Sequence, residues 1–244
     1  MIDSHAHMQA EEFRTDLEAV LQRARQAGVK AIITASVDLP DAQACLALAT
    51  HHDLLHPAIG LAPYSDLSQL EAVISLINQH SQKLAAIGEI GLDYAWQKHP
   101  EQVGPFRRQV ELARELDLAV SIHSRSAGKY VLDELSDLRA GKVHLHAFSG
   151  SLKDVRRAID LGYYLSVTAR VVNSERVQQL AMAIPEELLL IETDSPVLSP
   201  FEGRNEPANL APALQKLSEL KGIPSQELEH IIDKNAEKLF KLRN

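Results

Sequence analysis

Six residues spread along the chain have side chains that bind divalent metal ions, and each lies at the end of a short apolar run. They are His5, His7, Glu89, His123, His146 and Asp194. His5 and His7 are two residues apart, a spacing that puts both imidazoles on the same side of a strand, so both can bind one ion. Glu89 follows an apolar run, where an unpaired carboxylate is costly to desolvate, so a cation is its natural partner. Asp194 could bind an ion and also accept a proton from bound water.

This set of ligands predicts a centre with two divalent ions. Four imidazoles and two carboxylates suffice to hold two ions about 3.5 to 4 Å apart, with one carboxylate between them. The nitrogen content favours Zn, Mn or a similar ion over calcium. Because two such ions lower the pKa of a shared water and hold both the attacking and the leaving oxygen, the chemistry predicted is hydrolysis of an ester, an amide or a phosphodiester.

Each of these residues alone also has an ordinary structural explanation. A histidine at a strand end can be a solvated loop residue, Glu89 can pair with a basic side chain, and Asp194 can cap the segment that follows. We interpret the other histidines in such terms: His144 as packed and hydrogen-bonded in the core, and the rest as residues of helices or loops without partners. Those left out of the site are His51, His52, His56, His80, His99 and His230. Asp93 could join the site, but its position after Gly91 suggests a loop.

Eight short apolar or β-branched runs alternate with longer helical patterns along the chain. The runs begin near Met1, Ala31, Pro57, Leu84, Leu118, Lys142, Tyr163 and Leu188, at intervals of 21 to 34 residues. Helical patterns lie between them, for example over residues 16–27, before Gly28, and over residues 102–116. Eight units in 244 residues predict an α/β fold, the (β/α)8 TIM barrel, in which the C-terminal ends of all strands meet at one opening. The sequence therefore predicts one barrel domain over residues 1–244 that gathers the six ligands at its mouth.

The composition limits the expected location of the protein. No apolar stretch approaches the roughly 18 residues of a membrane span, and the N-terminus lacks the pattern of a signal peptide, so we expect a cytoplasmic protein without membrane contact. Cys45 is the only cysteine, which excludes an intrachain disulfide and a cysteine-type zinc cluster; we expect a buried thiol.

The charge of the chain limits how a nucleic acid could bind. A net charge of −8 repels polyanions on average, so any such contact must be local. Arg125, Lys129 and Arg204 lie in expected mouth loops, where they could neutralise phosphate charge. Tyr94 and Trp96 follow the fourth strand and could stack on a base. A surface salt bridge or a packed loop aromatic is the ordinary alternative for each of them.

Several motifs resemble those of the TatD family of metal-dependent hydrolases. They are Asp3-Ser4-His5-Ala6-His7, Gly88-Glu89-Ile90-Gly91-Leu92-Asp93, Ile122-His123-Ser124-Arg125, His146-Ala147-Phe148-Ser149-Gly150, Glu192-Thr193-Asp194-Ser195-Pro196 and Arg204-Asn205-Glu206-Pro207. The resemblance extends over essentially the whole chain. This family is a branch of the amidohydrolase-like barrels, and its better-known members are Mg-dependent nucleases that cut DNA, often as 3′ to 5′ exonucleases.

The resemblance also implies a role for each ligand. One ion would be held by His5, His7 and Asp194, and a second by His123 and His146, with Glu89 between the two. Asp194 would also orient or deprotonate the attacking water. The ions implied are two divalent cations, Mg, Mn or Zn.

One departure from the family pattern concerns the substrate. The family usually has a Gly-Ile-His-Pro-His-like stretch after the third strand, whereas this chain reads Gly60-Leu61-Ala62-Pro63-Tyr64, with apolar Ala62 where a polar contact is expected. The preferred prediction is a deoxyribonuclease that cleaves phosphodiester bonds, in single-stranded DNA rather than duplex, without an obligate protein partner. The alternatives are a hydrolase of a small ester, cyclic amide or aminoacyl ester, and a barrel without catalytic activity.

Overall fold

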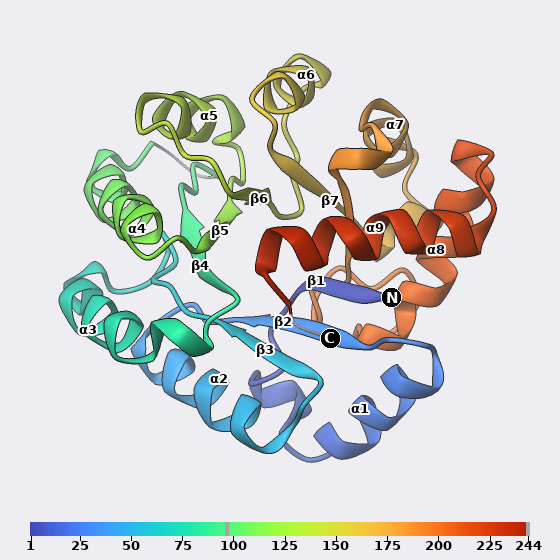
Figure 1. Ribbon diagram of the computed structural model, residues 1–244, viewed down its shortest axis with the longest axis horizontal. Coiled ribbons are helices and arrows are strands. Elements are labelled where there is room, and N and C mark those ends of the chain that lie inside the picture. The colour runs from blue at the N-terminus through green and yellow to red at the C-terminus, as the bar shows by residue number, and fades with distance from the viewer. Residues whose placement is uncertain (96–97, 243–244) are drawn as a thin grey trace.

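Eight parallel strands form one sheet that curves into a nearly closed barrel (Figure 1). The computed structural model describes residues 1–95 and 98–242. The strands follow one another in chain order: β1 (Ile2–Ala6), β2 (Ala31–Ala35), β3 (Leu55–Ala58), β4 (Ala86–Gly91), β5 (Ala119–His123), β6 (Val143–Leu145), β7 (Tyr164–Thr168) and β8 (Leu189–Glu192). Every strand begins within two residues of the start expected from the sequence, so the predicted barrel is confirmed.

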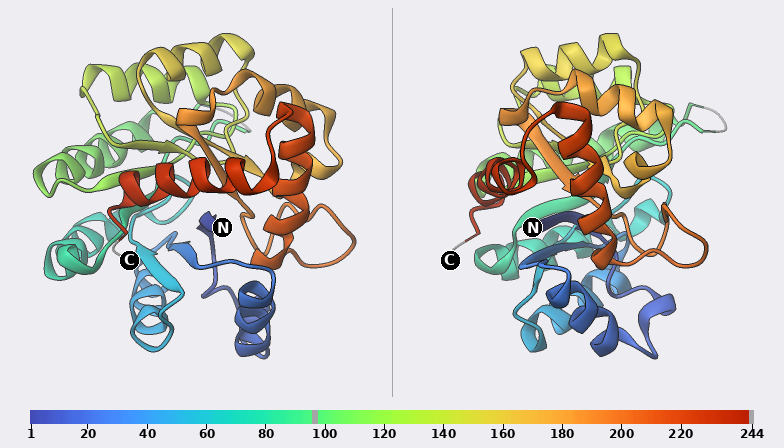
Figure 2. Two further views of the ribbon diagram at one scale, coloured as in Figure 1. Left: turned by 45° about the vertical axis from the view of Figure 1, so that its right-hand side comes forward. Right: turned by 90° about the vertical axis from the view of Figure 1, so that its right-hand side faces the viewer.

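Helices cover the outside of the strands (Figures 1 and 2). Seven of them connect successive strands, and two follow the last strand. They are α1 (Leu17–Gln26), α2 (Leu39–His51), α3 (Leu70–His80), α4 (Val103–Glu115), α5 (Gly128–Asp137), α6 (Leu152–Asp160), α7 (Glu175–Ala183), α8 (Leu210–Lys221) and α9 (Ser225–Phe240). Each crossover helix buries one apolar face; α1, for example, buries Val20, Leu21 and Ala24 and is followed by Gly28 at φ 89°. The helices expected over residues 16–27 and 102–116 are therefore confirmed, each slightly shorter than expected.

The barrel closes where the segment after β8 meets the end of β1. The backbone N–H of Asp194 donates to the His5 carbonyl at 2.9 Å, and the N–H of His7 donates to the Ser195 carbonyl at 2.7 Å. These hydrogen bonds place the first strand, β1, beside the last strand, β8. As a result, the carboxylate of Asp194 lies next to His5 and His7, which are almost 190 positions earlier in the sequence.

The C-terminal helix α9 covers the end of the barrel where the strands begin. Its residues Leu239 and Phe240 pack in one apolar cluster with Ile2 and Ala31, the first residues of β1 and β2. The opening therefore lies at the other end, where the strands finish. Cys45 is a buried thiol, as expected.

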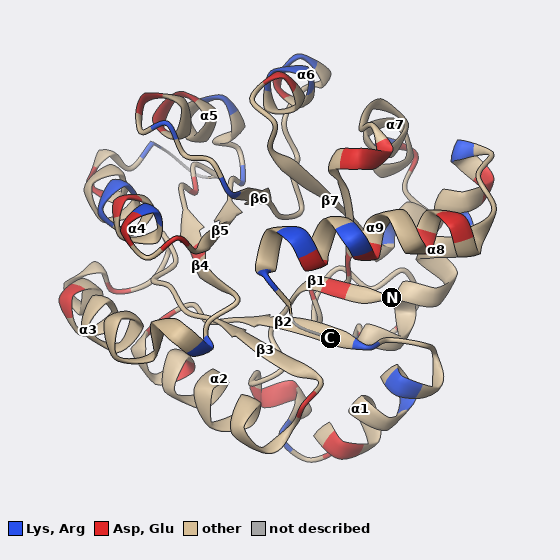
Figure 3. Cartoon of the chain, viewed as in Figure 1, with Lys and Arg blue, Asp and Glu red and all other residues tan. Residues whose placement is uncertain are grey.

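Charged side chains lie mainly over the outer helices, whereas the strands carry few of them (Figure 3). Both signs are mixed along α4, α5 and α9. In the described part of the chain, no helix combines the length and the apolar character needed to cross a membrane.

Candidate metal centre and active site

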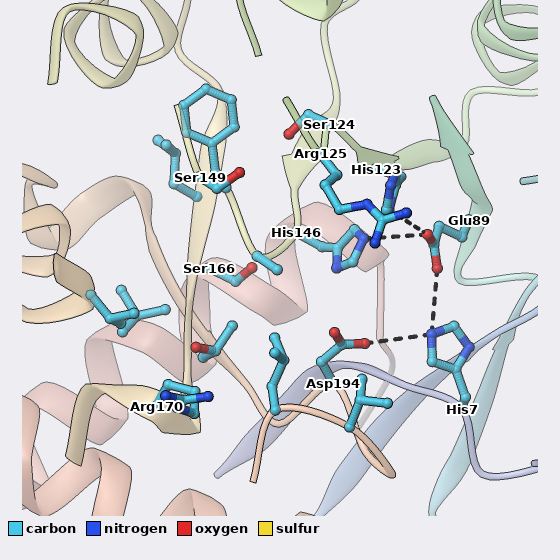
Figure 4. Close-up of a pocket in the computed structure, with 18 of the residues that line it drawn as sticks. His7, Glu89, His123, Ser124, Arg125, His146, Ser149, Ser166, Arg170 and Asp194 are labelled. Atoms are coloured by element: carbon cyan, nitrogen blue, oxygen red, sulfur yellow. Dashed lines mark ion pairs between the residues drawn. The ribbon is translucent and has the colours of Figure 1, made fainter. Parts of the chain in front are cut away.

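The structure brings the six predicted ligands to one place at the mouth of the barrel. They lie at the C-terminal ends of five strands: His5 in β1, His7 directly after it, Glu89 in β4, His123 at the end of β5, His146 directly after β6 and Asp194 two residues after β8. Figure 4 shows five of these side chains pointing into a common space. Two groups have ligand atoms that all lie within 4.8 Å of one another: His5, His7 and Asp194, and His5, Glu89 and His146.

The nitrogen and oxygen atoms of this cluster fit a bound cation better than they fit one another. The Nδ1 of His7 lies 2.8 Å from the Ala35 carbonyl, which only accepts, so Nδ1 carries a proton. In the neutral ring the lone pair is then on Nε2, which lies 3.3 Å from Nε2 of His5 and 3.4 Å from Glu89 Oε2. Two ligands of one ion at 2.0–2.2 Å are roughly 3 Å apart, close to these separations.

His146 gives the clearest sign of a missing partner. The residue is buried, yet neither ring nitrogen has a hydrogen-bond partner among the described residues. Its Nε2 is 3.6 Å from Oε1 of Glu89, which is also buried. Buried polar atoms are normally paired. A ring nitrogen of His146 and a carboxylate oxygen of Glu89 that face each other without a hydrogen bond are the arrangement expected of two ligands of one cation. The residues present therefore fit a divalent metal ion.

The pKa values of the cluster indicate where it requires positive charge. Burial opposes the charged form of His7, but hydrogen bonds with Asp194 and Glu89 outweigh it and raise the pKa of His7 to about 10. The negative charge of Glu89 likewise overcomes burial and raises the pKa of His146 well above its ordinary value. Burial and the charge on His146 together lower the pKa of His5 to about 4. Its ring is stacked on that of His146 at 3.8 Å, so both rings cannot be charged at once.

His123 is oriented by a carboxylate outside the cluster. Its Nε2 donates to Asp93 Oδ2 at 2.9 Å, which leaves Nδ1 facing Glu89 Oε1 at 2.8 Å. Asp93 also accepts from Arg125 Nε at 2.9 Å. Although burial opposes ionisation, the hydrogen bond with His123 lowers the pKa of Asp93 to about 2, so this carboxylate is charged. Asp93 lies in a loop, as expected, and it contacts the site through His123.

A chain of buried polar groups connects the backs of the histidines. Ser121 Oγ lies 3.1 Å from Nδ1 of both His5 and His144. On the other side of His144, Nε2 is 2.8 Å from Ser166 Oγ, which donates to Glu192 Oε2 at 2.6 Å. The predicted role of His144 as a packed, hydrogen-bonded core residue is confirmed. Glu192 was missed, although a carboxylate within the apolar run of β8 was a signal that it must be paired.

Tyr64 supplies a polar group near the position where the sequence seemed to lack one. Ala62 is buried and apolar, but the Tyr64 hydroxyl donates to Glu89 Oε1 at 3.1 Å. The edge of the ring lies against His123, with 5.4 Å between the ring centroids. Tyr64 lines the pocket and is 52% exposed, while its hydroxyl contacts the ligand cluster.

Comparison with known proteins decides the family. Residues 2–241 match the model of a family described as TatD related DNase. The chain belongs to the TatD family. It is 35% identical to an uncharacterized metal-dependent hydrolase, YabD, of Bacillus subtilis over 99% of both chains, and 32% identical to a 3′-5′ ssDNA/RNA exonuclease TatD of Salmonella typhimurium over 99% of both. Among solved structures, the TatD homologue YjjV of Escherichia coli has a TM-score of 0.92 at 32% identity and covers 100% of this chain and 98% of that one.

The TatD resemblance is thus confirmed, and with it the prediction of a TatD-type metal-dependent hydrolase on a TIM barrel. The metal requirement of the relatives agrees with the His/Glu/Asp cluster of this chain. In the TatD barrel of this chain the ligands surround a pocket of about 940 Å³ at the mouth. This volume is at the upper end of the usual range for ligand sites.

The structure separates the residues predicted to contact substrate. Arg125 lines the pocket, but Arg204 does not. The guanidinium of Arg204 binds Asp16 through both of its terminal nitrogens, at 2.9 and 2.7 Å, and lies 4.6 Å above the Phe13 ring.

The remaining predicted contacts lie beside the pocket or outside the described residues. Lys129 lines a separate, smaller pocket of about 220 Å³. Tyr94 packs edge-on against Tyr130, with 5.3 Å between the ring centroids. The predicted stacking residue Trp96 falls outside the described residues.

Proposed function

We propose that this TatD family member hydrolyses phosphodiester bonds of single-stranded DNA or RNA with the aid of two divalent ions. The observation that carries the proposal is the cluster of inward-facing nitrogens and carboxylate oxygens in which His146 has no hydrogen-bond partner within residues 1–95 and 98–242. The names of the relatives, which include a deoxyribonuclease TATDN3 of Homo sapiens at 32% identity and the bacterial ssDNA/RNA exonuclease, support the substrate class. One barrel domain over residues 1–244 and a cytoplasmic location stay predictions from the sequence.

The assignment of ligands is the one that the family resemblance implies, and the group of His5, His7 and Asp194 supports it. His5, His7 and Asp194 would hold one ion, and Glu89 with His146 and His123 would hold the other. His5 faces both groups, because its Nε2 lies 3.4 Å from Glu89 Oε2 and 3.8 Å from Asp194 Oδ1. Bound Mg, Mn or Zn would polarise the scissile phosphate and lower the pKa of the attacking water.

Asp194 is the residue proposed to orient that water and take its proton. Its backbone has φ 57°, a left-handed conformation that is costly for a residue with a side chain. Two hydrogen bonds hold it there: its N–H donates to His5, and its carbonyl accepts from the Val197 N–H at 3.0 Å. The carboxylate therefore has a fixed direction toward the His7 side of the cluster, as Figure 4 shows. Tyr64 would hold Glu89 in position through its hydroxyl.

The test is cleavage of an end-labelled single-stranded oligonucleotide by purified protein that has been stripped with EDTA. Cleavage is expected only after Mg²⁺, Mn²⁺ or Zn²⁺ is added back. The Asp194→Asn variant keeps the size of the side chain and loses the proton acceptor, so its rate should fall by about 10²–10⁴-fold. Equal rates for the two proteins under all three ions, or no cleavage by either, would overturn the proposal.

The apolar side of the pocket favours a second candidate, hydrolysis of a small ester or cyclic amide. Phe148, Leu165, Val167 and Leu180 line the pocket beside the ligand cluster. A small apolar substrate would bury its body against them, as in many small-molecule sites. Turnover of such an ester or cyclic amide at a higher kcat/KM than an oligonucleotide would favour this candidate.

A further inference from the structure

Two arginines on the β7–α7 side of the mouth carry positive charge that nothing in the described structure neutralises. Arg170 lies in the short 3-10 helix Ala169–Val172 after β7, and Arg176 is the second residue of α7. Both line the 940 Å³ pocket and both are exposed. In Figure 4, Arg170 lies on the opposite side of the pocket from His7 and Glu89, with Asp194 and His146 between them.

The other charged groups of the pocket are acidic or already paired. Its described carboxylates are Glu12, Asp41, Glu89, Asp93 and Asp194, and its third arginine, Arg125, is bound to Asp93. Within residues 1–95 and 98–242, neither Arg170 nor Arg176 has a carboxylate within 4.0 Å. Arg170 Nε makes only a long contact of 3.4 Å with Asn173 Oδ1. The two guanidinium groups are therefore the arginine side chains of the pocket that have no carboxylate partner among the described residues.

The position of Arg176 is unfavourable for the helix that carries it. It lies in the first turn of α7, where the helix macrodipole disfavours a cation. Its Nη2 instead donates to the Ser149 carbonyl at 2.5 Å, so the side chain is held across the gap between the β6–α6 and β7–α7 loops. The Arg176 side chain thus has no ion pair among the described residues and is unfavourable for the helix dipole. Because it is nevertheless fixed at the rim of the pocket, it can bind an anion from solution.

We propose that Arg170 and Arg176 form a phosphate-binding subsite that holds the backbone of the nucleic-acid strand next to the phosphate at the metal centre. This inference rests on the proposed phosphodiesterase function. Arginine binds phosphate oxygens through two parallel N–H groups, and such contacts release counterions from the strand. The subsite explains how an acidic protein binds a polyanion: the attraction is confined to one rim of one pocket.

The test compares the double variant R170A/R176A with a matched control, R108A/R139A. The control loses the same charge, because Arg108 on α4 and Arg139 after α5 are exposed, lie outside the pocket and have no carboxylate partner in the described chain. Binding of a fluorescent single-stranded oligonucleotide is measured by anisotropy in EDTA, where no turnover occurs. We expect Kd to rise at least about tenfold in R170A/R176A, with a plot of log Kd against log salt less steep by about 1.4. The control should match the wild type.

A second measurement separates this inference from the proposed function. Bis(p-nitrophenyl) phosphate has one phosphodiester and no neighbouring phosphate, so R170A/R176A should turn it over at the wild-type rate while its KM for the oligonucleotide rises about tenfold. Equal oligonucleotide Kd values for the double variant and the control would overturn the subsite, even if the enzyme cleaves DNA. Failure of the wild type to cleave any phosphodiester would overturn the proposed function, and the binding experiment would still decide the subsite.

Discussion

Metal binding by this protein should release at least one proton at pH 7.5. Without an ion, hydrogen bonds with Asp194 and Glu89 raise the pKa of His7 to about 10, so its ring carries a proton at this pH, and nearby carboxylates also raise the pKa values of His146 and His123. The pKa of His5 is about 4, so it has none to lose. A ring nitrogen must be deprotonated to bind an ion, and each displaced proton makes the affinity rise about tenfold per pH unit. Because His7 titrates above this range, the affinity for Mn²⁺ or Zn²⁺ should rise at least about tenfold between pH 7 and 8.

The proton count is measured by isothermal titration calorimetry in several buffers that differ in ionisation enthalpy, with EDTA-stripped protein. His7→Ala removes a protonated ring and should release about one proton fewer. His51→Ala, a variant of an exposed histidine at the end of α2, should release the wild-type number. An affinity that does not change between pH 7 and 8, or a wild type that releases no protons, would refute the reasoning that these rings hold the charge an ion replaces.

Three further substitutions test the surroundings of the cluster. Tyr64→Phe removes the hydroxyl donor to Glu89, so kcat/KM should fall about tenfold with an unchanged melting temperature. A kcat/KM equal to that of the wild type would show that this hydrogen bond does not contribute to catalysis. Glu192→Gln should weaken metal binding about 10–100-fold by calorimetry, and an unchanged affinity would contradict a role in orienting His146 or the ligands behind it. Gly91→Ala places a Cβ 2.0 Å from a backbone oxygen of β5 at φ 147°, so it should lower the free energy of unfolding by at least about 3 kcal/mol in urea titrations; an equally stable variant would contradict this close approach.

The sequence predicts the barrel well because its strands are buried on both faces. A run such as Ala31–Ala35 is buried from end to end, and the regular alternation with amphipathic helices leaves few other folds. The ligand set is predicted for the same reason. Once eight strands are parallel, polar residues at their C-terminal ends must meet, whatever their separation in the chain.

The contacts around the ligands are harder to predict, because they depend on how far a side chain extends in the folded protein and not only on its position in the sequence. When the motifs are compared position by position, Ala62 replaces a polar residue of the family. The long side chain of Tyr64, two residues further along, nevertheless brings a hydroxyl to Glu89. Arg204 lies in a loop after β8 as expected, but the fold brings Asp16 and Phe13 within reach of its guanidinium. Such a pairing between residues about 190 positions apart has no signature in the sequence.

The buried polar chain behind the cluster fixes which nitrogen of His5 faces the metal site. The Glu192 carboxylate only accepts, so Ser166 donates to it and must accept from Nε2 of His144. Burial lowers the pKa of His144, so its ring is neutral and Nδ1 has a lone pair, to which Ser121 donates. The single hydroxyl proton of Ser121 is then used, and Nδ1 of His5 must donate to its oxygen.

The consequence reaches His5 from β8 along a path through residues of β7, β6 and β5. With the proton of His5 on Nδ1, the lone pair on Nε2 is left for an ion. In Glu192→Gln the amide oxygen can still accept from the Ala147 N–H, while its NH₂ donates toward Ser166 and reverses every donor along the chain. The proton of His5 would then lie on Nε2, where an ion must bind. The buried carboxylate of Glu192, which is not proposed as a metal ligand, thus decides which nitrogen of His5, four groups away, carries the proton. Its loss should therefore weaken metal binding without changing the shape of the site.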